Sequence, residues 1–440
     1  MIKIICMVIT MVITSFYFFP FEFVFLPGIN TKMAMAAVGL VLLGVRMAQS
    51  RSAILNKDFF TLTLWALGVS LVGFVAVVYN DTHDYTYASY VMSMWVWAGA
   101  AYVVMELIRK VHGKISVELV AHYLIAVCVL QCILALLIDR IPAFEQAVNS
   151  VVSGLGFVEL NTLDKMNRLY GIGASLDVAG TRFSAILVMI AFLVTRLESK
   201  KQNLYLPFYI IAVFIIGTVG NMMSRTTTVG LILFMAYLVY NSRIYVLKIT
   251  PEVRNIFGWL AGSLLVLIPI LIYLYHTDMD VRNNLRFAFE GFFSLAEEGR
   301  WNVHSNEILK NMYVFPDNLK TWFIGDGYFD NPYYSDSEPY YVGPKMGGFY
   351  MGTDVGYLRF IFYFGLLGLF LFSFFMCLSG KVCMQKFKKE KALFVLLLMV
   401  NFIVWFKVST DIFLVFALFL VCTPENEENS IGKNATCIEA

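Results

Sequence analysis

The chain has 440 residues, of which 59% are hydrophobic and only 15% are charged, and its formal net charge is +2. So few charges over so long a chain exclude an ordinary soluble protein and a disordered one, and they indicate a polytopic membrane protein. The seven cysteines are scattered and none lies in the longest polar segment, which argues against a disulfide framework or a zinc site.

Apolar runs that approach the length needed to cross a bilayer, about 20 residues each, follow one another along most of the chain. They predict an all-α polytopic membrane protein with about 12 transmembrane helices. The first run follows Lys3 and has no small-residue cleavage site, so we expect an uncleaved helix. The predicted spans lie at about 4–20, 31–48, 59–79, 87–108, 118–138, 181–196, 203–222, 225–241, 256–275, 355–380, 391–406 and 409–422.

Lysine and arginine are concentrated in every second connection, which is typical of cytoplasmic loops. Both termini are therefore predicted to be cytoplasmic, and the polar stretches between the other spans to lie outside. We expect nine helices and an outer loop at about 139–180 within 1–275, a large outer loop at 276–354, three helices within 355–422 and a cytoplasmic tail at 423–440. The basic connections contain Arg46, Arg51 and Lys57; Arg109, Lys110 and Lys114; Arg196, Lys200 and Lys201; Arg243, Lys248 and Arg254; and Lys381, Lys386, Lys388, Lys389 and Lys391.

Five arginines stand out because they lie near predicted span ends or loops on the outer side, where basic residues should be rare. Arg168 and Arg182 flank the entry to the sixth span, Arg225 opens the eighth, Arg300 lies in the large loop, and Arg359 lies about one turn inside the tenth. A guanidinium group suits bidentate binding of phosphate oxygens, so we expect these arginines to gather at one membrane–water boundary. The alternative for each is an arginine whose charge merely reaches the lipid headgroups.

Asp354 lies where the large loop re-enters the membrane, and a carboxylate there is costly enough to suggest a function. It could act as a general base or orient an acceptor hydroxyl, or it could only cap the helix, with Thr353 as the competing cap. His304 could share this chemistry or be a solvated loop histidine. The tyrosines from Tyr333 to Tyr341 could stack on sugar rings or anchor the loop at the interface.

Several motifs are absent from the sequence. It contains no GxxxxGK[ST], no HExxH and no GxSxG, so nothing indicates ATP as an energy source, a metalloprotease site or a hydrolase elbow. Asp278-Met279-Asp280 has the spacing of a metal-binding pair, and a metal role there stays open. We otherwise expect no cofactor, no resident metal and no nucleic-acid partner.

Several short motifs occur in the same order as in a known family. They are Ser224-Arg225 at a helix start, Gly299-Arg300-Trp301 early in the large loop, Ile324-Gly325-Asp326-Gly327, and Asp354-Val355-Gly356-Tyr357. In these motifs and in its topology the chain resembles the bacterial O-antigen and capsule repeat-unit polymerases, the Wzy family. The motif resemblance covers about the last half of the chain.

The resemblance implies a membrane-embedded glycosyltransferase of the GT-C-like class in the bacterial inner membrane. Such an enzyme transfers a glycan from undecaprenyl diphosphate to the non-reducing end of another lipid-linked repeat unit, on the periplasmic side, in lipopolysaccharide or capsule biosynthesis. It needs no nucleotide sugar, and a separate chain-length regulator is an expected partner. Asp354 and Arg300 would be catalytic, and Arg168, Arg182, Arg225, Arg359 and His304 would bind the diphosphate or glycan.

Two alternatives stay open. The related O-antigen ligases transfer glycan to lipid A core, but they carry His-Asn where this chain has Thr353-Asp354. A flippase or another transporter should place its charges near the middle of several spans, beside broken helices. Here the predicted spans are nearly free of charge, and the candidate charges gather on one side.

Overall fold

The computed structural model of the chain describes residues 2–50, 57–153, 168–197, 199–242, 251–335, 338 and 341–422. A helix is present at the place of each predicted apolar run. These helices are α1 (Ile2–Phe18), α2 (Thr31–Ser50), α3 (Lys57–Asn80), α4 (Tyr90–His112), α5 (Val117–Arg140), α8 (Leu176–Val194), α9 (Ser199–Met223), α10 (Thr227–Ser242), α11 (Pro251–Thr277), α16 (Gly356–Lys386), α17 (Lys391–Val404) and α18 (Phe413–Leu420).

Seven of the described helices are long and apolar enough to cross a membrane: α3, α4, α5, α8, α9, α11 and α16. The chain is therefore a multi-pass helical membrane protein. Helices α1 and α10 are apolar but shorter, and α17 and α18 have 14 and 8 residues. The total of about 12 spans stays a prediction.

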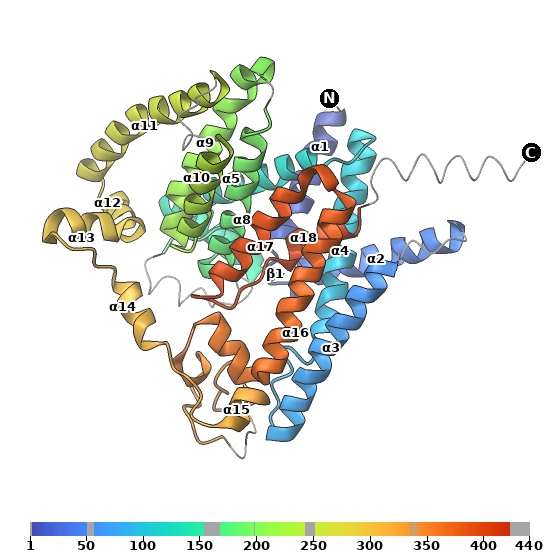
Figure 1. The fold of residues 1–440 in the computed structure, drawn as a ribbon. Helices are drawn as coiled ribbons and strands as arrows, with labels where there is room; N and C mark the ends of the chain where they lie inside the picture. Colours follow the sequence, from blue (N-terminus) through green and yellow to red (C-terminus); the bar gives the residue numbers. More distant parts are fainter. Residues whose placement is uncertain are drawn as a thin grey trace, which may run out of the picture.

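The helices form a bundle with two ends that differ in their connections (Figure 1). We call one end the loop face. Six helices end there, namely α1, α3, α5, α9, α11 and α17, and the apolar helices that follow them begin there, namely α2, α4, α8, α10, α16 and α18. Contacts across this end include Asn80 Nδ2 to Gly325 O at 3.1 Å and Arg140 to Asp278 at 2.7 Å. The chain begins at the opposite end, where Arg196 pairs with Glu390 at 3.5 Å.

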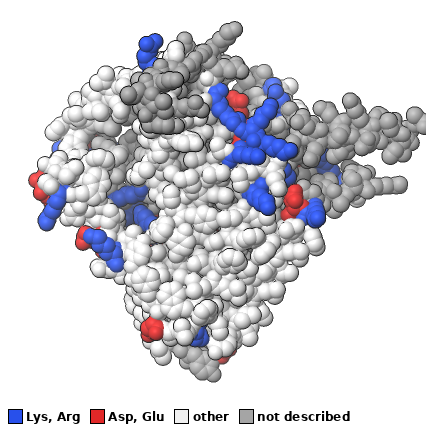
Figure 2. All heavy atoms as spheres, viewed as in Figure 1, with Lys and Arg blue, Asp and Glu red and all other residues white. Residues whose placement is uncertain are grey.

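Lysine and arginine side chains gather toward the end at which α1 begins, and the lower surface in the same view is mostly uncharged (Figure 2). This distribution agrees with the alternation of basic connections in the sequence. The predicted tail at 423–440 and parts of the basic connections at 51–56 and 243–250 lie outside the described residues.

Helices α8 and α18 form the centre of the bundle. Every residue of α8 from Ala179 to Val194 is buried, as is all of α18. Helix α8 packs closely on α10, because a Cβ on Gly230 would lie 2.3 Å from Ser184 Cα. Such glycine contacts allow close approach of helices in a membrane, where lipid removes most of the hydrophobic drive for association. Helix α11 lies at the edge of the bundle with few buried residues (Figure 1).

A small antiparallel sheet departs from the all-α expectation. Strand β1 (Glu22–Phe23) pairs with β2 (Leu26–Asn30) and with β3 (Val152–Ser153), in the order β2-β1-β3. These strands are two to five residues long, too short to give a clear alternating pattern. The sheet joins the connection after α1 to the end of α6 (Pro142–Val151) on the loop face.

The large loop between α11 and α16 begins with three short helices, α12 (Met279–Ala288), α13 (Glu290–Glu298) and α14 (His304–Asn311). The remainder is mostly irregular and includes α15 (Leu319–Phe323) and η2 (Tyr350–Gly352). The short turn η3 (Lys388–Glu390) joins α16 to α17 at the opposite end.

Asp278 at the start of this loop caps a helix and forms an ion pair. Its carboxylate accepts hydrogen bonds from the backbone N–H groups of Asp280 and Val281 at the start of α12. It also receives two hydrogen bonds from Arg140, of 2.7 and 3.1 Å. Within the described part of the chain, no group of three or more His, Cys, Asp or Glu side chains is placed to hold a metal ion. The geometry therefore assigns Asp278 to capping and ion pairing.

Helix α16 is broken at Phe364-Gly365, where Gly365 has φ 70° and ψ −175°. The break leaves backbone carbonyl groups without partners inside the helix, and the loop after α15 satisfies two of them. Asp326 N donates to Phe362 O at 2.5 Å, and Gly327 N donates to Tyr363 O at 3.1 Å. The Ile324–Gly327 motif is thus explained by a packing role, since it holds the first turns of α16 in place.

Candidate functional site

Three helices begin close together on the loop face and bring charged residues with them. Asp177 lies in the first turn of α8, Arg225 lies between α9 and α10, and Asp354 lies two residues before α16. The side chains of Ser224 and Thr226 lie 3.5 and 3.2 Å from the same Asp177 oxygen. These contacts connect the first turn of α8 to the residues just before α10.

Asp354 is mostly buried, and it does not cap the helix that follows. The residue before the first turn of α16 is Val355, which provides no side-chain cap. Thr353 Oγ1 accepts a hydrogen bond of 3.3 Å from Val355 N. Burial, and after it the neighbouring charge of Asp177, raise the pKa of Asp354, whereas Arg359 and Lys407 lower it; the net result is a pKa of about 8. The structure thus rejects the capping alternative and leaves a carboxyl group whose pKa suits proton transfer near neutral pH.

Arg359 lies beside Asp354, with Nη1 3.8 Å from the Asp354 Oδ1 atom. The same guanidinium group donates to Ser409 Oγ at 3.2 Å and to Phe329 O at 3.0 Å, and it forms an ion pair with Asp330. It stacks over the Phe329 ring at 3.7 Å. Most of its donors are occupied by protein, so Arg359 chiefly connects the large loop to α16 and holds Asp354 in place.

Arg225 is held by contacts from the large loop. Its Nη1 atom lies 2.6 Å from Glu290 Oε2 and donates to Ser305 Oγ at 2.9 Å. Its guanidinium group lies 4.1 Å from the Phe287 ring, and Arg168 lies 4.9 Å from the same ring. Burial lowers the pKa values of both Arg225 and Arg168. Glu290 raises the pKa of Arg225, and the like charge of Arg168 lowers it. The structure therefore brings two of the predicted arginines together.

Lys407, in the connection between α17 and α18, completes this cluster. Its Nζ atom lies 3.3 Å from Thr226 Oγ1. Burial lowers the pKa of Lys407; the charges of Asp177 and Asp354 raise it, and those of Arg225 and Arg168 lower it further. Lys407 thus interacts electrostatically both with the two arginines and with Asp354. We call Arg168, Asp177, Arg225, Asp354 and Lys407 the ionic cluster.

The sequence contained a signal for the two members that were missed. Lys407 is a basic residue in a predicted outer connection, which is the criterion that selected the arginines. Asp177 lies between Arg168 and Arg182 in the segment RLYGIGASLDVAGTRF. An acid in the first turn of a helix is an ordinary favourable charge at a helix start, so its position alone does not indicate a functional site.

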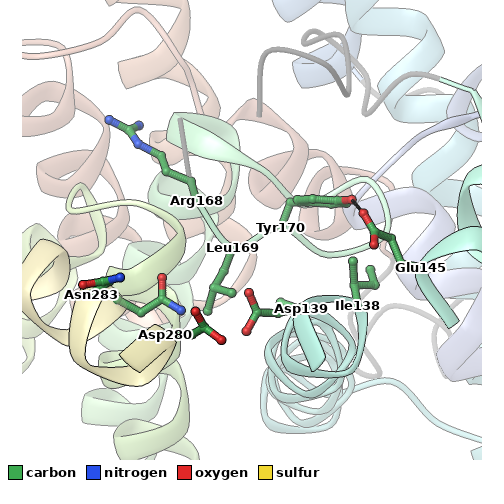
Figure 3. Close-up of a pocket in the computed structure, with 10 residues that line it drawn as sticks. Ile138, Asp139, Glu145, Arg168, Leu169, Tyr170, Asp280 and Asn283 are labelled. Atoms are coloured by element: carbon green, nitrogen blue, oxygen red, sulfur yellow. Dashed lines mark hydrogen bonds between the residues drawn. The ribbon is translucent and has the colours of Figure 1, made fainter. Parts of the chain in front are cut away.

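Arg168 also borders a pocket of about 330 Å³ between α5, α6 and α12. Figure 3 shows Asp139 and Asp280 facing one another across this pocket, while the guanidinium group of Arg168 points away from both. Tyr170 donates a hydrogen bond of 3.2 Å to Glu145 at the other side. Acidic groups face the pocket, so it is unsuited to an anion.

Arg182 does not join the cluster, contrary to expectation. It is buried inside α8, where it donates a hydrogen bond to Phe18 O at the end of α1. Its guanidinium group lies 5.4 Å from the Phe19 ring and 5.9 Å from the Trp97 ring. A fully enclosed arginine that binds a helix-end carbonyl has a packing role, which the sequence position alone could not reveal.

Arg300 is also separate from Asp354. Its side chain is 77% exposed, and its ion-pair partner is Glu298 at 3.4 Å. The geometry therefore gives no support for a catalytic role of Arg300. His304 is the first residue of α14, and its backbone N–H donates to Glu290 Oε1 at 3.2 Å. His304 and Arg225 both line a pocket of about 420 Å³, so His304 lies close to the candidate site.

The tyrosine-rich part of the loop forms a second pocket of about 560 Å³ near Arg359. Its lining residues include His83, Tyr328, Asp330, Asn331 and Tyr333. Tyr333 is exposed, whereas Tyr328 is buried and donates to Glu338 at 3.0 Å. Of the other three predicted tyrosines, Tyr334 is exposed, Tyr341 donates a hydrogen bond of 2.7 Å to Asn331 Oδ1, and Tyr340 lies outside the described residues.

No protein-family model, curated protein or solved structure matches this chain. Fold and site define it as a multi-pass helical membrane protein with a buried ionic cluster under its largest loop.

Proposed function

We propose that the chain is a repeat-unit polymerase of the bacterial inner membrane. It would transfer a growing glycan from undecaprenyl diphosphate to the non-reducing end of a second lipid-linked repeat unit, with the loop face toward the periplasm. The motif resemblance to the Wzy family suggests this activity. The observation that carries it is the ionic cluster, in which three cations and a buried carboxyl group meet at a membrane boundary.

The cations of the cluster suit a diphosphate leaving group. When the bond from the anomeric carbon to the diphosphate breaks, negative charge increases on the diphosphate oxygens. Arg168, Arg225 and Lys407 are desolvated, so they would stabilise that charge more strongly than cations in water. Fixed cations act mainly on the transition state, because charge is greater there than in the ground state.

Asp354 would accept the proton of the acceptor hydroxyl as that oxygen attacks the anomeric carbon. With a pKa of about 8, about a tenth of the Asp354 side chains are ionised at pH 7. The ionised form is a much stronger base than an ordinary aspartate. The pocket beside Arg359, with aromatic, amide and carboxylate groups, would hold part of the glycan.

The charges around Asp354 predict two opposite shifts in the pH profile. Asp177→Asn removes a negative neighbour, so the pKa of Asp354 should fall and activity should persist to lower pH. Lys407→Met removes a positive neighbour, so the pKa should rise and the acidic limb should move to higher pH. We expect shifts of about one pH unit in kcat/KM, measured with purified protein and lipid-linked repeat units.

Lys310→Met is the control for these shifts. Lys310 is an exposed lysine of the loop that pairs with Glu307 at 2.9 Å, so its removal should leave the acidic limb in place. Shifts of both cluster variants in the same direction would show that the limb does not belong to Asp354.

The break in α16 bears on the flippase alternative, because transporters commonly contain broken helices. The break lies about nine residues into the helix, or roughly 13 Å from its start. Its freed carbonyl groups bind loop N–H groups, whereas transporters use such groups to bind ions in a cavity. The break therefore gives no support to a transporter. The ligase alternative shares the diphosphate chemistry and differs in its acceptor.

Deletion of the gene separates the three functions by the glycan that remains. We expect single repeat units on lipid A core, or short products in a capsule system, with long chains restored by the wild-type gene. Loss of all glycan on lipid A core would indicate a ligase instead. Accumulation of lipid-linked units on the cytoplasmic side would indicate a flippase. Electrophoresis of lipopolysaccharide and topology-resolved labelling of lipid-linked glycan distinguish these outcomes.

A further inference from the structure

Glu290 occupies a place that is built for an anion. Its Oε2 atom lies 2.6 Å from Arg225 Nη1, and its Oε1 atom accepts a hydrogen bond of 3.2 Å from His304 N. His304 begins α14, whose free N–H groups favour negative charge. The same Arg225 nitrogen donates a hydrogen bond of 2.9 Å to Ser305 Oγ. A guanidinium group, a helix start and a hydroxyl thus surround one internal carboxylate.

The fit between Glu290 and Arg225 is incomplete. Glu290 Oε2 accepts no direct hydrogen bond, and Arg225 Nε donates none, from any side chain or backbone group that the structure describes. The ion pair is close, but its hydrogen-bond directions are poor. Both groups are largely desolvated, at 16% and 31% side-chain exposure, so these missing bonds are costly. A ligand with more acceptor oxygens could use donors that Glu290 leaves free.

The Glu290 side chain has a route out of this position. A pocket of about 420 Å³ is lined by Arg225, Glu290, Asn302, His304 and Glu307, among others. Glu290 is partly exposed toward it, so rotation of its side chain could place the carboxylate in water.

We propose that Glu290 is an internal competitor for the phosphate site, whose carboxylate must leave Arg225 and the α14 start before a diphosphate group can bind there. The inference rests on the proposed function for the identity of the ligand. Only the molecules in which the Glu290 carboxylate has left Arg225 could bind diphosphate. The apparent Kd would therefore equal the Kd of the open site divided by the fraction of such molecules. Glu290 would thus set substrate affinity and keep the cations of the site paired between turnovers.

Binding of undecaprenyl diphosphate and of inorganic pyrophosphate tests the inference on full-length protein in detergent at pH 7. Glu290→Gln keeps an acceptor for His304 N but loses the charge. Glu290→Asp keeps the charge but shortens the reach to Arg225. We expect both variants to lower the Kd for undecaprenyl diphosphate, on the order of tenfold for Glu290→Gln. If pyrophosphate alone shows the effect, the ligand is a free phosphate rather than a lipid headgroup.

Glu297→Gln is the matched control, because Glu297 lies in the same helix and pairs with Arg286 at 2.6 Å. Its Kd should stay within about twofold of wild type. Arg225→Met should abolish the gain in Glu290→Gln. Thermal unfolding of each variant shows whether it is folded.

Two outcomes would overturn the inference in different ways. In the first, wild type binds undecaprenyl diphosphate and folded Glu290→Gln protein binds it with the same or a higher Kd. Glu290 would then support the site rather than compete for it, and the proposed function would stand. Absence of diphosphate binding by wild type and by both Glu290 variants would refute the phosphate site itself, together with the proposed function.

Discussion

Replacing Asp354 by asparagine is expected to lower the rate of polymerisation by about a hundred- to ten-thousandfold, the usual range for loss of a general base. Asparagine has nearly the same shape but cannot accept the acceptor proton. In the proposed mechanism, ionisation of the buried Asp354, with its pKa of about 8, would limit activity at neutral pH. The acidic limb of the pH profile should also disappear from any residual activity. The measurement is the initial rate with purified protein, from pH 6 to pH 9.

Asp317→Asn is the control for this result. Asp317 lies in the same loop, is exposed, and accepts a hydrogen bond of 2.8 Å from Asn318. Its replacement should leave both rate and pH profile unchanged. Wild-type chain lengths from a strain that carries only the Asp354→Asn protein would remove Asp354 from the mechanism, whatever the geometry around it.

The second large effect is expected from Gly365→Ala, which should destabilise the protein by at least about 3 kcal/mol. Gly365 has φ 70° and ψ −175°, a conformation that is essentially limited to glycine. A Cβ there would lie 2.2 Å from Phe323 O, and neither backbone can move without breaking the contact between the loop and α16. Gly325→Ala should have a similar effect, because its Cβ would lie 2.4 Å from Tyr363 O.

Loss of this contact should reduce the amount of protein in membranes and its thermal unfolding temperature in detergent. Gly68→Ala is the matched control: it lies inside α3, and a Cβ there would meet no atom within 4 Å. That change should be neutral or slightly stabilising. Equal unfolding temperatures for the Gly365→Ala and Gly68→Ala proteins would contradict the inferred role of the break.

The break also has a consequence for the site. Tyr363, just before it, has a hydroxyl group that donates to Asp84 O at 2.6 Å and accepts from Tyr87 N at 3.2 Å. These bonds and the contact with the loop hold the first turns of α16, which carry Arg359. Asp354 is positioned by the same turns. A weakened contact should therefore lower activity even in protein that remains folded.

The membrane-embedded helical class could be predicted from the sequence, because long apolar runs leave a strong signal that needs no tertiary information. The same holds for the places of the helices and for the position of Asp354 just before the apolar helix α16. Arg225 was predicted to lie near other charged residues, because a basic residue in a predicted outer connection is rare. These features depend on residues that are close together in the chain.

Which charges meet was decided only by the tertiary structure. Arg182 and Arg225 look alike in the sequence, yet one binds a carbonyl inside the bundle and the other faces Glu290. Lys407 and Asp177, 230 residues apart, come together because the connection after α17 and the start of α8 both contact Thr226 in the connection after α9. Helix packing places side chains from distant segments in contact, and no local pattern records which face of each helix turns inward.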